Sequence, residues 1–316
     1  MALAGKLNIM RYIGSKENLL GFIENTVTAS GITQGTFCDL FAGTTTVGRH
    51  FKRRGFQVIS NDLMEYSFVF GKAYLENNSV PQFAGLDLPP ARPSLFDFDT
   101  TRLEQVLNYL NHLSPQAGFI YENYCDVGTI GKEHSRMYFS ASNAGKIDAV
   151  RNQIQQWHDD HLVTDSEFYV LLASLLEAVP SVSNTTGTYA AFLKFWESRS
   201  QKALTLTVPP IINSELNHKV YKNNANDIIS RISCNVLYLD PPYNSRQYAP
   251  NYHIMETIAR WDAPIIYGKS GLRPYKEEKS DYCQEKRLIK GLRGFTRQLK
   301  EIFFNMFGSY SYVSCQ

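Results

Sequence analysis

Three features are missing from the sequence, and each absence argues against a class of protein. No apolar run approaches the roughly 20 residues that a membrane-spanning helix needs. The five cysteines show no C-x-x-C spacing, which argues against structural zinc and for a reducing compartment. The N-terminus carries no uninterrupted apolar core of the signal-peptide type. We therefore expect a cytoplasmic protein with no metal site and no membrane partner.

A strong excess of one charge is also missing. The formal net charge is +2 over 316 residues, and charged residues make up 20% of the chain. A protein that wraps nucleic acid is usually more basic, so a polyanionic partner has to be met by a local patch. The 43% share of apolar residues is typical of a globular chain that buries a sizeable core in one enlarged domain or two.

The early segment TFCDLFAGTTTVGRHFKRRGFQVISND (36–62) predicts half of a nucleotide-binding fold. Its apolar run ends at Asp39, a small-residue turn follows at 42–44, and after a short helix a second strand ends at Asp62. Gly43 lets the backbone approach a ligand closely, and the helix after it directs N–H groups toward that ligand. Asp62 lies where a carboxylate can accept both hydroxyls of a ribose, although capping or solvated carboxylates are commoner. Without a G-x-G-x-x-G turn, an adenosine that carries no phosphates fits better than a dinucleotide.

A second pair of strands is predicted in the last third of the chain. Val220 and Tyr221 begin one of them, and the pair 226–227 closes it before a short helix. Asp227 is interpreted as the N-cap of that helix, or as a contact for the adenine of a cofactor. The spacing alone does not choose between these two roles.

The other strand, 236–239, is short, apolar and predicted to be buried. Pro241 removes an N–H group and keeps Asp240 extended, so the strand has to stop there. In open α/β sheets, ligands bind at the carboxyl ends of the strands. We therefore expect a ligand site at the stretch Asp240, Pro241, Pro242 and Tyr243.

About 140 residues separate the two halves, many more than usually join a helix to a strand, so the sequence predicts an inserted domain. The insert opens with a proline-rich linker and contains a helix near 166–179 with one apolar face. Two polar stretches, 131–151 and 183–202, are either plain loops or contacts for phosphates and base edges. The expected architecture is an α/β catalytic domain formed by 1–80 and 218–316, with a mainly helical target-recognition insert at 81–217.

The stretch 240–243 suits methylation of an amino group on a nucleobase. Such an amino group is a poor nucleophile, because its lone pair is delocalised into the ring. The Asp240 carboxylate and the Pro241 carbonyl can accept its two N–H bonds and so direct the lone pair toward an electrophile. Tyr243 can stack on a base that has left the duplex. The electrophile would be the methyl group of S-adenosylmethionine, placed by the Gly43 turn, and no metal is required.

Four motifs, in this order, resemble the Dam-like (α-group) DNA adenine-N6 methyltransferases. They are RYIGSK (11–16), DLFAGTTTVG (39–48), ISND (59–62) and YLDPPYNSRQY (238–248). The resemblance implies a Rossmann-like, S-adenosylmethionine-dependent methyltransferase sheet with the insert as target-recognition domain. It implies a catalytic motif made of Asp240, Pro241, Pro242 and Tyr243. The expected cofactor-binding residues are Tyr12, Lys16, Asp39, Phe41, Gly43, Asp62, Asp227 and Asp240.

The activity expected from this resemblance is site-specific methylation of adenine N6 in double-stranded DNA. Such an enzyme would act on a flipped-out base and could be the modification half of a restriction system with a cognate endonuclease. Asp240 favours adenine, since Asn is expected in related motifs for glutamine and Ser is common for cytosine. Two alternatives stay open: an acceptor in RNA or cytosine, and an inactive relative that only binds DNA or cofactor.

The end of the sequence carries two further expectations. The helix 284–306 has an apolar and a basic side, which indicates a surface helix or a contact to DNA phosphate. The strand expected at 307–316 is normally followed by more strands in the resembled group. We therefore expect a shortened sheet that a complementing polypeptide would complete.

Overall fold

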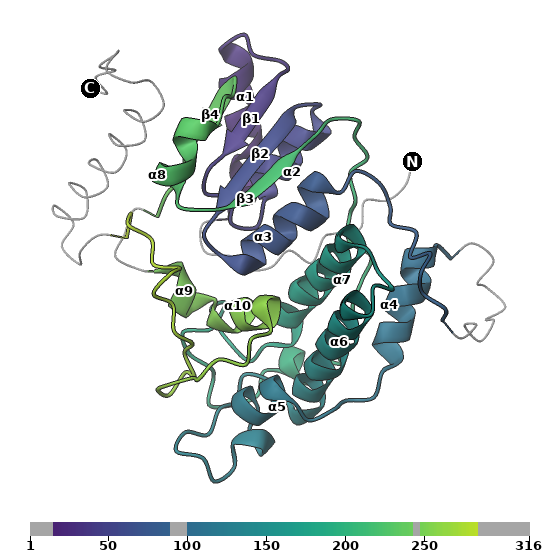
Figure 1. Ribbon diagram of the computed structural model, residues 1–316. Coiled ribbons are helices and arrows are strands. Elements are labelled where there is room, and N and C mark those ends of the chain that lie inside the picture. The colour runs from purple at the N-terminus through teal and green to yellow at the C-terminus, as the bar shows by residue number, and fades with distance from the viewer. Residues whose placement is uncertain (1–14, 89–99, 243–246, 284–316) are drawn as a thin grey trace.

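The computed structural model describes residues 15–88, 100–242 and 247–283 (Figure 1). The expectations on Tyr12, Tyr243, the helix 284–306 and the strand 307–316 lie outside these residues. Over the ranges that are described, no helix combines the length and the apolar character needed to cross a membrane.

A parallel sheet forms the upper layer in Figure 1, and its strand order is β3-β2-β1-β4. The strands are β1 (Thr36–Asp39), β2 (Gln57–Asp62), β3 (Lys219–Lys222) and β4 (Val236–Tyr238). The register pairs Phe37 with Val58 of β2 and with Val236 of β4. Because β1 is parallel to both neighbours and β3 is parallel to β2, all four carboxyl ends meet at one edge. The predicted α/β class is confirmed.

Both faces of the sheet are covered, as a parallel sheet requires. Phe37 and Val58 pack with apolar residues of α2 (Thr46–Arg53) on one face. The next residues along the same strands, Cys38 and Ile59, pack with α8 (Ala225–Ile228) on the other. This change of face between consecutive residues follows from the period of two in a strand. The helix α1 (Leu20–Ala29) lies beside α2.

The prediction that strand β3 runs to residues 226–227 is wrong. It ends at Lys222, because the next backbone groups bond to a side chain: the Asn223 N–H donates to Asn61 Oδ1 at 3.1 Å and the Asn223 carbonyl accepts from Asn61 Nδ2 at 3.0 Å. The N-cap of α8 is Asn224, whose side chain accepts the Asn226 N–H, so the interpretation of Asp227 as the cap is also wrong.

Strand β4 is half-buried along its length, whereas the sequence predicts a buried strand. Within the described part of the chain it pairs with β1 alone and so lies at the sheet edge. Its regular structure ends at Tyr238, before Asp240 and Pro241, in agreement with the predicted stop.

A helical layer packs below the sheet in Figure 1. From the expected insert it contains α4 (Arg102–His112), α5 (Phe119–Tyr124), α6 (Ala141–Asp159) and α7 (Asp165–Ala178). From outside it come α3 (Glu65–Gly71), the π-helical turn Lys72–Glu76, α9 (Tyr248–Asn251) and α10 (His253–Arg260). Short 3₁₀ turns occur at Glu17–Leu19, Val127–Thr129, Val179–Val182, Ser198–Gln201 and Ile229–Arg231.

These helices share one hydrophobic core, so residues on both sides of the insert pack with it. The predicted apolar face of α7 is confirmed as core, since Leu171, Leu175 and Leu176 are fully buried. Helix α3 contacts β2 and β3 above it and α7 and α10 below it. It therefore joins the two layers directly after the strand that ends at Asp62.

The polar stretch 131–151 is neither a plain loop throughout nor an exposed basic surface. Its second half belongs to α6, and its cations bind backbone carbonyls. Arg151 donates to the carbonyls of Ile258 (2.8 Å) and Ala259 (3.4 Å) at the end of α10, and Lys146 donates to the Asn111 carbonyl (2.8 Å) near the end of α4. Carbonyls at helix C-termini lack partners within the helix, so these cations satisfy them.

Replacing Arg151 with methionine should therefore lower stability and leave nucleic-acid affinity unchanged. Arg151 is 1% exposed, and loss of its guanidinium leaves backbone carbonyls without this partner, so we expect the free energy of unfolding to fall by ~2–3 kcal/mol. Urea titration measures this change. Lys194→Met, at an exposed position, is the control and should shift stability by less than about 0.5 kcal/mol. A stable Arg151→Met protein that binds duplex DNA more weakly would contradict this interpretation.

Candidate functional site

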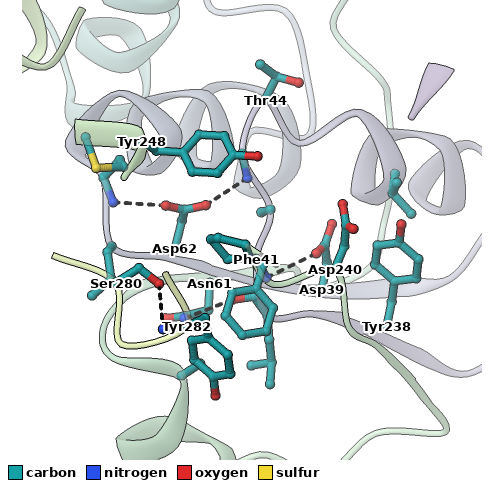
Figure 2. A pocket seen from close by; sticks show the side chains of 18 of the residues that line it. Asp39, Phe41, Thr44, Asn61, Asp62, Tyr238, Asp240, Tyr248, Ser280 and Tyr282 are labelled. Atoms are coloured by element: carbon teal, nitrogen blue, oxygen red, sulfur yellow. Dashed lines mark hydrogen bonds between the residues drawn. The ribbon is translucent and has the colours of Figure 1, made fainter. Parts of the chain in front are cut away.

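A pocket opens where the carboxyl ends of the strands meet (Figure 2). Most of the residues expected at the ligand site line it together: Lys16, Asp39, Phe41, Gly43, Asp62, Asp240 and Pro242. They come from segments far apart in the chain, and the parallel strand order brings them to one edge. Pro241 is buried beside the pocket without being part of its lining.

Asp62, at the end of β2, is hydrogen-bonded through both carboxylate oxygens. Oδ2 accepts the Gly43 N–H at 2.8 Å and Oδ1 accepts the Met64 N–H at 3.0 Å (Figure 2). Burial raises the pKa of Asp62, and these hydrogen bonds oppose that rise. A carboxylate oxygen can accept two hydrogen bonds, so Asp62 can hold the turn after β1 and still accept from a ligand hydroxyl.

The turn predicted at residues 42–44 follows β1 in the structure. Gly43 has φ 52°, in the left-handed region that a residue without Cβ adopts at little cost. Thr45, the N-cap of α2, also has a positive φ of 60°. The Gly43 N–H is directed at Asp62, so the turn is joined to the end of the next strand.

Three carboxylates, those of Asp39, Asp62 and Asp240, lie close enough to influence one another. Burial raises the pKa of Asp39 to about 7, and the negative charges of the other two contribute to that rise. The N–H of Phe41, which donates to Asp39 Oδ1 at 3.3 Å, acts in the opposite direction. A pocket with this much negative charge favours a ligand that carries positive charge.

Lys16 supplies a positive charge inside this group. Its Nζ lies 2.5 Å from Oδ2 of Asp240, and both side chains are partly buried. In this structure Lys16 is thus the counter-ion of Asp240, and its expected role toward the cofactor stays a prediction.

Asp227 is the expected site residue that the structure places elsewhere. It is exposed in the first turn of α8 and does not line the pocket. Asn223, Asn224 and Ala225 line the pocket in its place. They follow β3 directly, so the rule that found Asp62, a polar residue at the carboxyl end of a strand, would also have found them once the end of β3 was known.

Two other groups of lining residues were not among the expected site residues, although Tyr248 is the last residue of the motif at 238–248. Tyr248 lies on α9, and a segment beyond α10 contributes Glu278, Ser280, Asp281 and Tyr282. The segment reads as a plain polar loop. Only the packing of the chain brings it to the sheet edge.

The fold and the pocket define a class of protein, a parallel α/β protein with a candidate ligand site at the carboxyl edge of its sheet. Comparison with known families narrows this class. The family model for the D12 class N6 adenine-specific DNA methyltransferases matches residues 12–306. The chain belongs to this family.

Curated relatives agree with this assignment. The chain is 42% identical over 278 residues to the type II methyltransferase M.FokI of Planomicrobium okeanokoites. The aligned region covers 88% of this chain and 41% of the relative. It is 37% identical over 294 residues to the modification methylase StsI of Streptococcus sanguinis, covering 92% and 42%. It is 36% identical over 330 residues to the type II methyltransferase M.NlaIII of Neisseria lactamica, covering 97% and 91%.

The chain thus spans less than half the length of the first two relatives and nine-tenths of the third. No solved structure matches it.

Proposed function

We propose that this chain is a site-specific DNA methyltransferase that transfers a methyl group from S-adenosylmethionine to N6 of adenine. The observation that carries the proposal is the position of Asp240 and Pro242, just after β4, in one pocket with Gly43 and Asp62. The family and the names of the relatives support the reaction and a place in a cytoplasmic restriction–modification system with a cognate endonuclease. The order of the motifs supports a Dam-like arrangement.

The strand order sets the direction in which a cofactor would lie. Asp240 follows β4, the Gly43 turn follows β1, Asp62 ends β2, and Asn223 and Asn224 follow β3. With the ribose at Asp62, the methyl group has to face Asp240 on the β4 side. The adenine of the cofactor then extends toward β3.

The residues present fit S-adenosylmethionine in their chemistry. Asp62 is a partly buried carboxylate with acceptor capacity for ribose hydroxyls, and Asp39 and Asp240 add negative charge beside it. The cofactor would supply the electrophilic methyl group. The Gly43 turn allows close approach of the backbone, and Lys16, which lines the pocket, would attract a carboxylate at the amino-acid end.

Asp240 and the carbonyl of Pro241 would act on the target base. They would accept hydrogen bonds from the two N–H groups of the adenine amino group and so direct its lone pair out of the ring system. Two prolines in succession hold these acceptors at a fixed separation, since each ring restricts its own backbone and that of the residue before it. Tyr243, by position in the motif, would stack on the flipped base.

Target recognition is proposed for the insert 81–217. A cleft beside the active pocket is lined by hydroxyl side chains of the segment 181–207 together with Lys202, Glu177 and Tyr252. The Tyr252 ring stacks on that of Tyr248, which lines the active pocket, with centroids 6.2 Å apart. A cleft next to the active pocket, lined by side chains that can donate and accept hydrogen bonds, suits contacts to the DNA that flanks the flipped base.

Incubation of the purified protein with methyl-labelled S-adenosylmethionine tests the proposal. Parallel reactions contain unmethylated duplex DNA, RNA, or protein from a cell lysate, and nucleoside digestion with mass spectrometry identifies the product. We expect N6-methyladenine in the DNA reaction alone. Label in cytosine, RNA or protein would assign a different acceptor, and no label in any reaction would contradict catalysis by this chain.

Cofactor affinity should depend on pH through Asp39. Its raised pKa means that the protonated form stabilises the fold, a contribution complete below about pH 4 and lost as the pH rises through about 7. A positively charged ligand favours the carboxylate and so has to displace the proton at low pH. We expect S-adenosylmethionine affinity to rise about tenfold from pH 6 to pH 8.

Calorimetry on the wild type and on Asp39→Asn measures this dependence. In the variant, the part of the pH dependence of affinity that comes from Asp39 should be lost. Any pH dependence from ionisation of the cofactor itself remains in both proteins. Identical slopes would show that Asp39 does not titrate on binding.

A further inference from the structure

One wall of the active pocket is made by residues 278–282, which lie beyond α10 and far from the sheet in sequence. Glu278, Ser280, Asp281 and Tyr282 all line the pocket. Figure 2 shows Ser280 and Tyr282 among the lining side chains. Tyr282 is 3% exposed and Glu278 is 5% exposed, so the segment is anchored at both ends, while Lys279 and Asp281 between them are exposed.

Hydrogen bonds hold this 278–282 segment against two neighbouring elements. Ser280 pairs twice with Gln247, which precedes α9: its N–H donates to Oε1 at 2.8 Å and its carbonyl accepts from Nε2 at 3.0 Å. Asp281 Oδ2 accepts from Asn224 Nδ2 at 3.0 Å, just after β3. The segment thus spans from the helical layer to the β3 side of the sheet edge.

Tyr282 brings an aromatic ring to the β3 side of the sheet edge. Its ring meets that of Phe41 edge to face, with centroids 5.0 Å apart, and its hydroxyl contacts Asn226 Oδ1 at 3.1 Å. Phe41 follows β1 and Asn226 lies on α8, so the ring is held between the turn after β1 and the element after β3.

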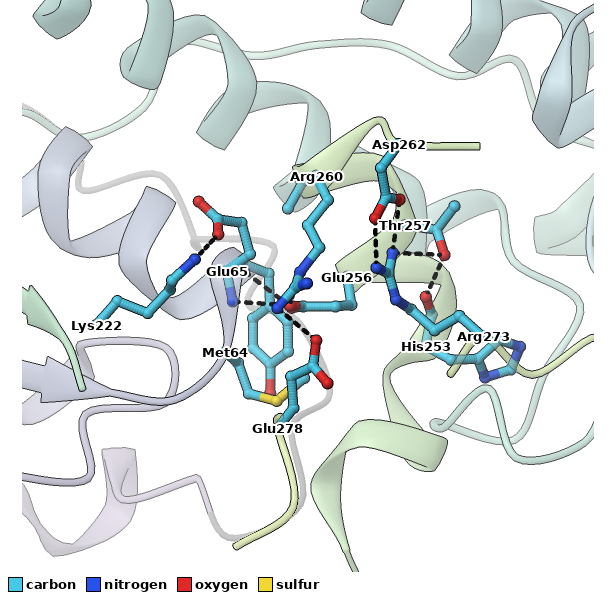
Figure 3. A network of polar contacts seen from close by, with 12 residues as sticks. Met64, Glu65, Lys222, His253, Glu256, Thr257, Arg260, Asp262, Arg273 and Glu278 are labelled. Carbon is cyan, nitrogen blue, oxygen red and sulfur yellow. Dashed lines mark hydrogen bonds and ion pairs between the residues drawn. The ribbon is translucent and has the colours of Figure 1, made fainter. Parts of the chain in front are cut away.

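A network of ion pairs holds Glu278, the first residue of the segment, in place (Figure 3). Arg260, at the end of α10, contacts Glu278 through Nη2 and Glu256 through Nε, the latter at 2.8 Å. Glu256 is 1% exposed and accepts the backbone N–H groups of Glu65 (3.0 Å) and Tyr66 (3.3 Å) at the start of α3. The pocket wall is therefore connected through Arg260 to the helix that follows Asp62.

We propose that the 278–282 segment is a clamp for the nucleoside end of the cofactor, with Tyr282 as its ring contact and Glu278 as the residue that positions it through Arg260. The inference rests on the proposed function, because it assumes S-adenosylmethionine in this pocket.

Two arguments place the nucleobase, and not the amino-acid end, at the clamp. The methyl group has to face Asp240 on β4, so with the ribose at Asp62 the base lies toward β3, where the segment meets Asn224. The chemistry agrees, since the rings of Phe41 and Tyr282 offer apolar faces and edges for a purine. Asn224 and Asp281 offer a donor and an acceptor for its polar edge.

The test compares S-adenosylmethionine with adenosine, which lacks the amino-acid end. Binding is measured by calorimetry for the first and by competition for the second. Tyr282→Ala should weaken both ligands by the same factor, about tenfold or more, because stacking on an aromatic ring contributes strongly for any base. Tyr282→Phe keeps the ring and should stay within about threefold of the wild type.

Glu278→Gln keeps the shape of the side chain and removes its charge. It should weaken both ligands at least threefold and raise KM for S-adenosylmethionine while kcat stays within about twofold, as expected for a positioning residue. Lys222→Gln is the matched control. It removes an ion pair with Glu65, the first residue of α3, and Lys222 does not line the pocket, so this variant should bind both ligands like the wild type.

Unchanged affinity of Tyr282→Ala and Glu278→Gln for both ligands would overturn the clamp while leaving the proposed function intact. A loss for S-adenosylmethionine without a loss for adenosine would also overturn it, since the segment would then contact the amino-acid end. A wild-type protein that binds neither ligand would overturn both proposals. Melting temperatures of all variants identify any that fail to fold, and Glu278→Gln then decides if Tyr282→Ala is one of them.

Discussion

Asp240→Ala is expected to lower kcat for DNA methylation by at least about 100-fold, or ~2.7 kcal/mol of transition-state stabilisation. The carboxylate would bond an amino group that is pyramidal and partly positive only while the methyl group is being transferred. Such a bond is made mainly in the transition state, so its loss lowers kcat more than it raises KM. Single-turnover kinetics with a methylatable duplex measures the change.

The fold should survive this substitution, because Asp240 is partly exposed at the end of β4 and outside the three hydrophobic clusters of the sheet and helical layer. Its loss also leaves Lys16 without this partner, so cofactor affinity is measured alongside the rate. Asp227→Ala, an exposed carboxylate on α8, is the control and should keep the wild-type rate. Retention of more than about a tenth of the rate by Asp240→Ala, under ~1.4 kcal/mol, is too small a loss for the proposed role.

Asp62→Ala should weaken S-adenosylmethionine binding by roughly 2–4 kcal/mol, or about 30- to 800-fold. Hydrogen bonds to a carboxylate are the strong kind, and the ribose hydroxyls would donate to this partly buried one. The substitution also removes the acceptor for the Gly43 N–H, so the turn loses its connection to β2. Calorimetry on both proteins gives the difference in affinity.

Asp62→Asn separates the two effects. It keeps one acceptor oxygen and the shape of the side chain, so the turn should persist while part of the ribose interaction is lost. We expect a melting temperature near that of the wild type and an affinity between those of the wild type and Asp62→Ala. Equal affinities for wild type and Asp62→Ala would return Asp62 to a purely structural role.

Much of the site was predictable because its residues follow local rules. Apolar runs that stop at Asp39, Asp62 and Pro241 mark the ends of parallel strands, and such ends meet at one edge of a sheet. Gly43, in a run of small residues, is recognisable as part of a turn. The sequence predicts an end of β3 that lies beyond the observed one at Lys222. The strand stops there because the Asn61 side chain bonds to the backbone of Asn223, and these two residues are 162 positions apart in the sequence.

What the sequence by itself determined is the ends of β1, β2 and β4 and the chemistry they carry, because breakers, apolar runs and carboxylates act over a few neighbouring residues. Tertiary structure alone decided that β4 lies beside β1, that Arg151 binds the end of α10, and that the 278–282 segment closes the pocket. Each of these depends on partners distant in sequence. Whether a charged side chain meets solvent, a carbonyl or a ligand is set by the packing around it, and no local pattern encodes that packing.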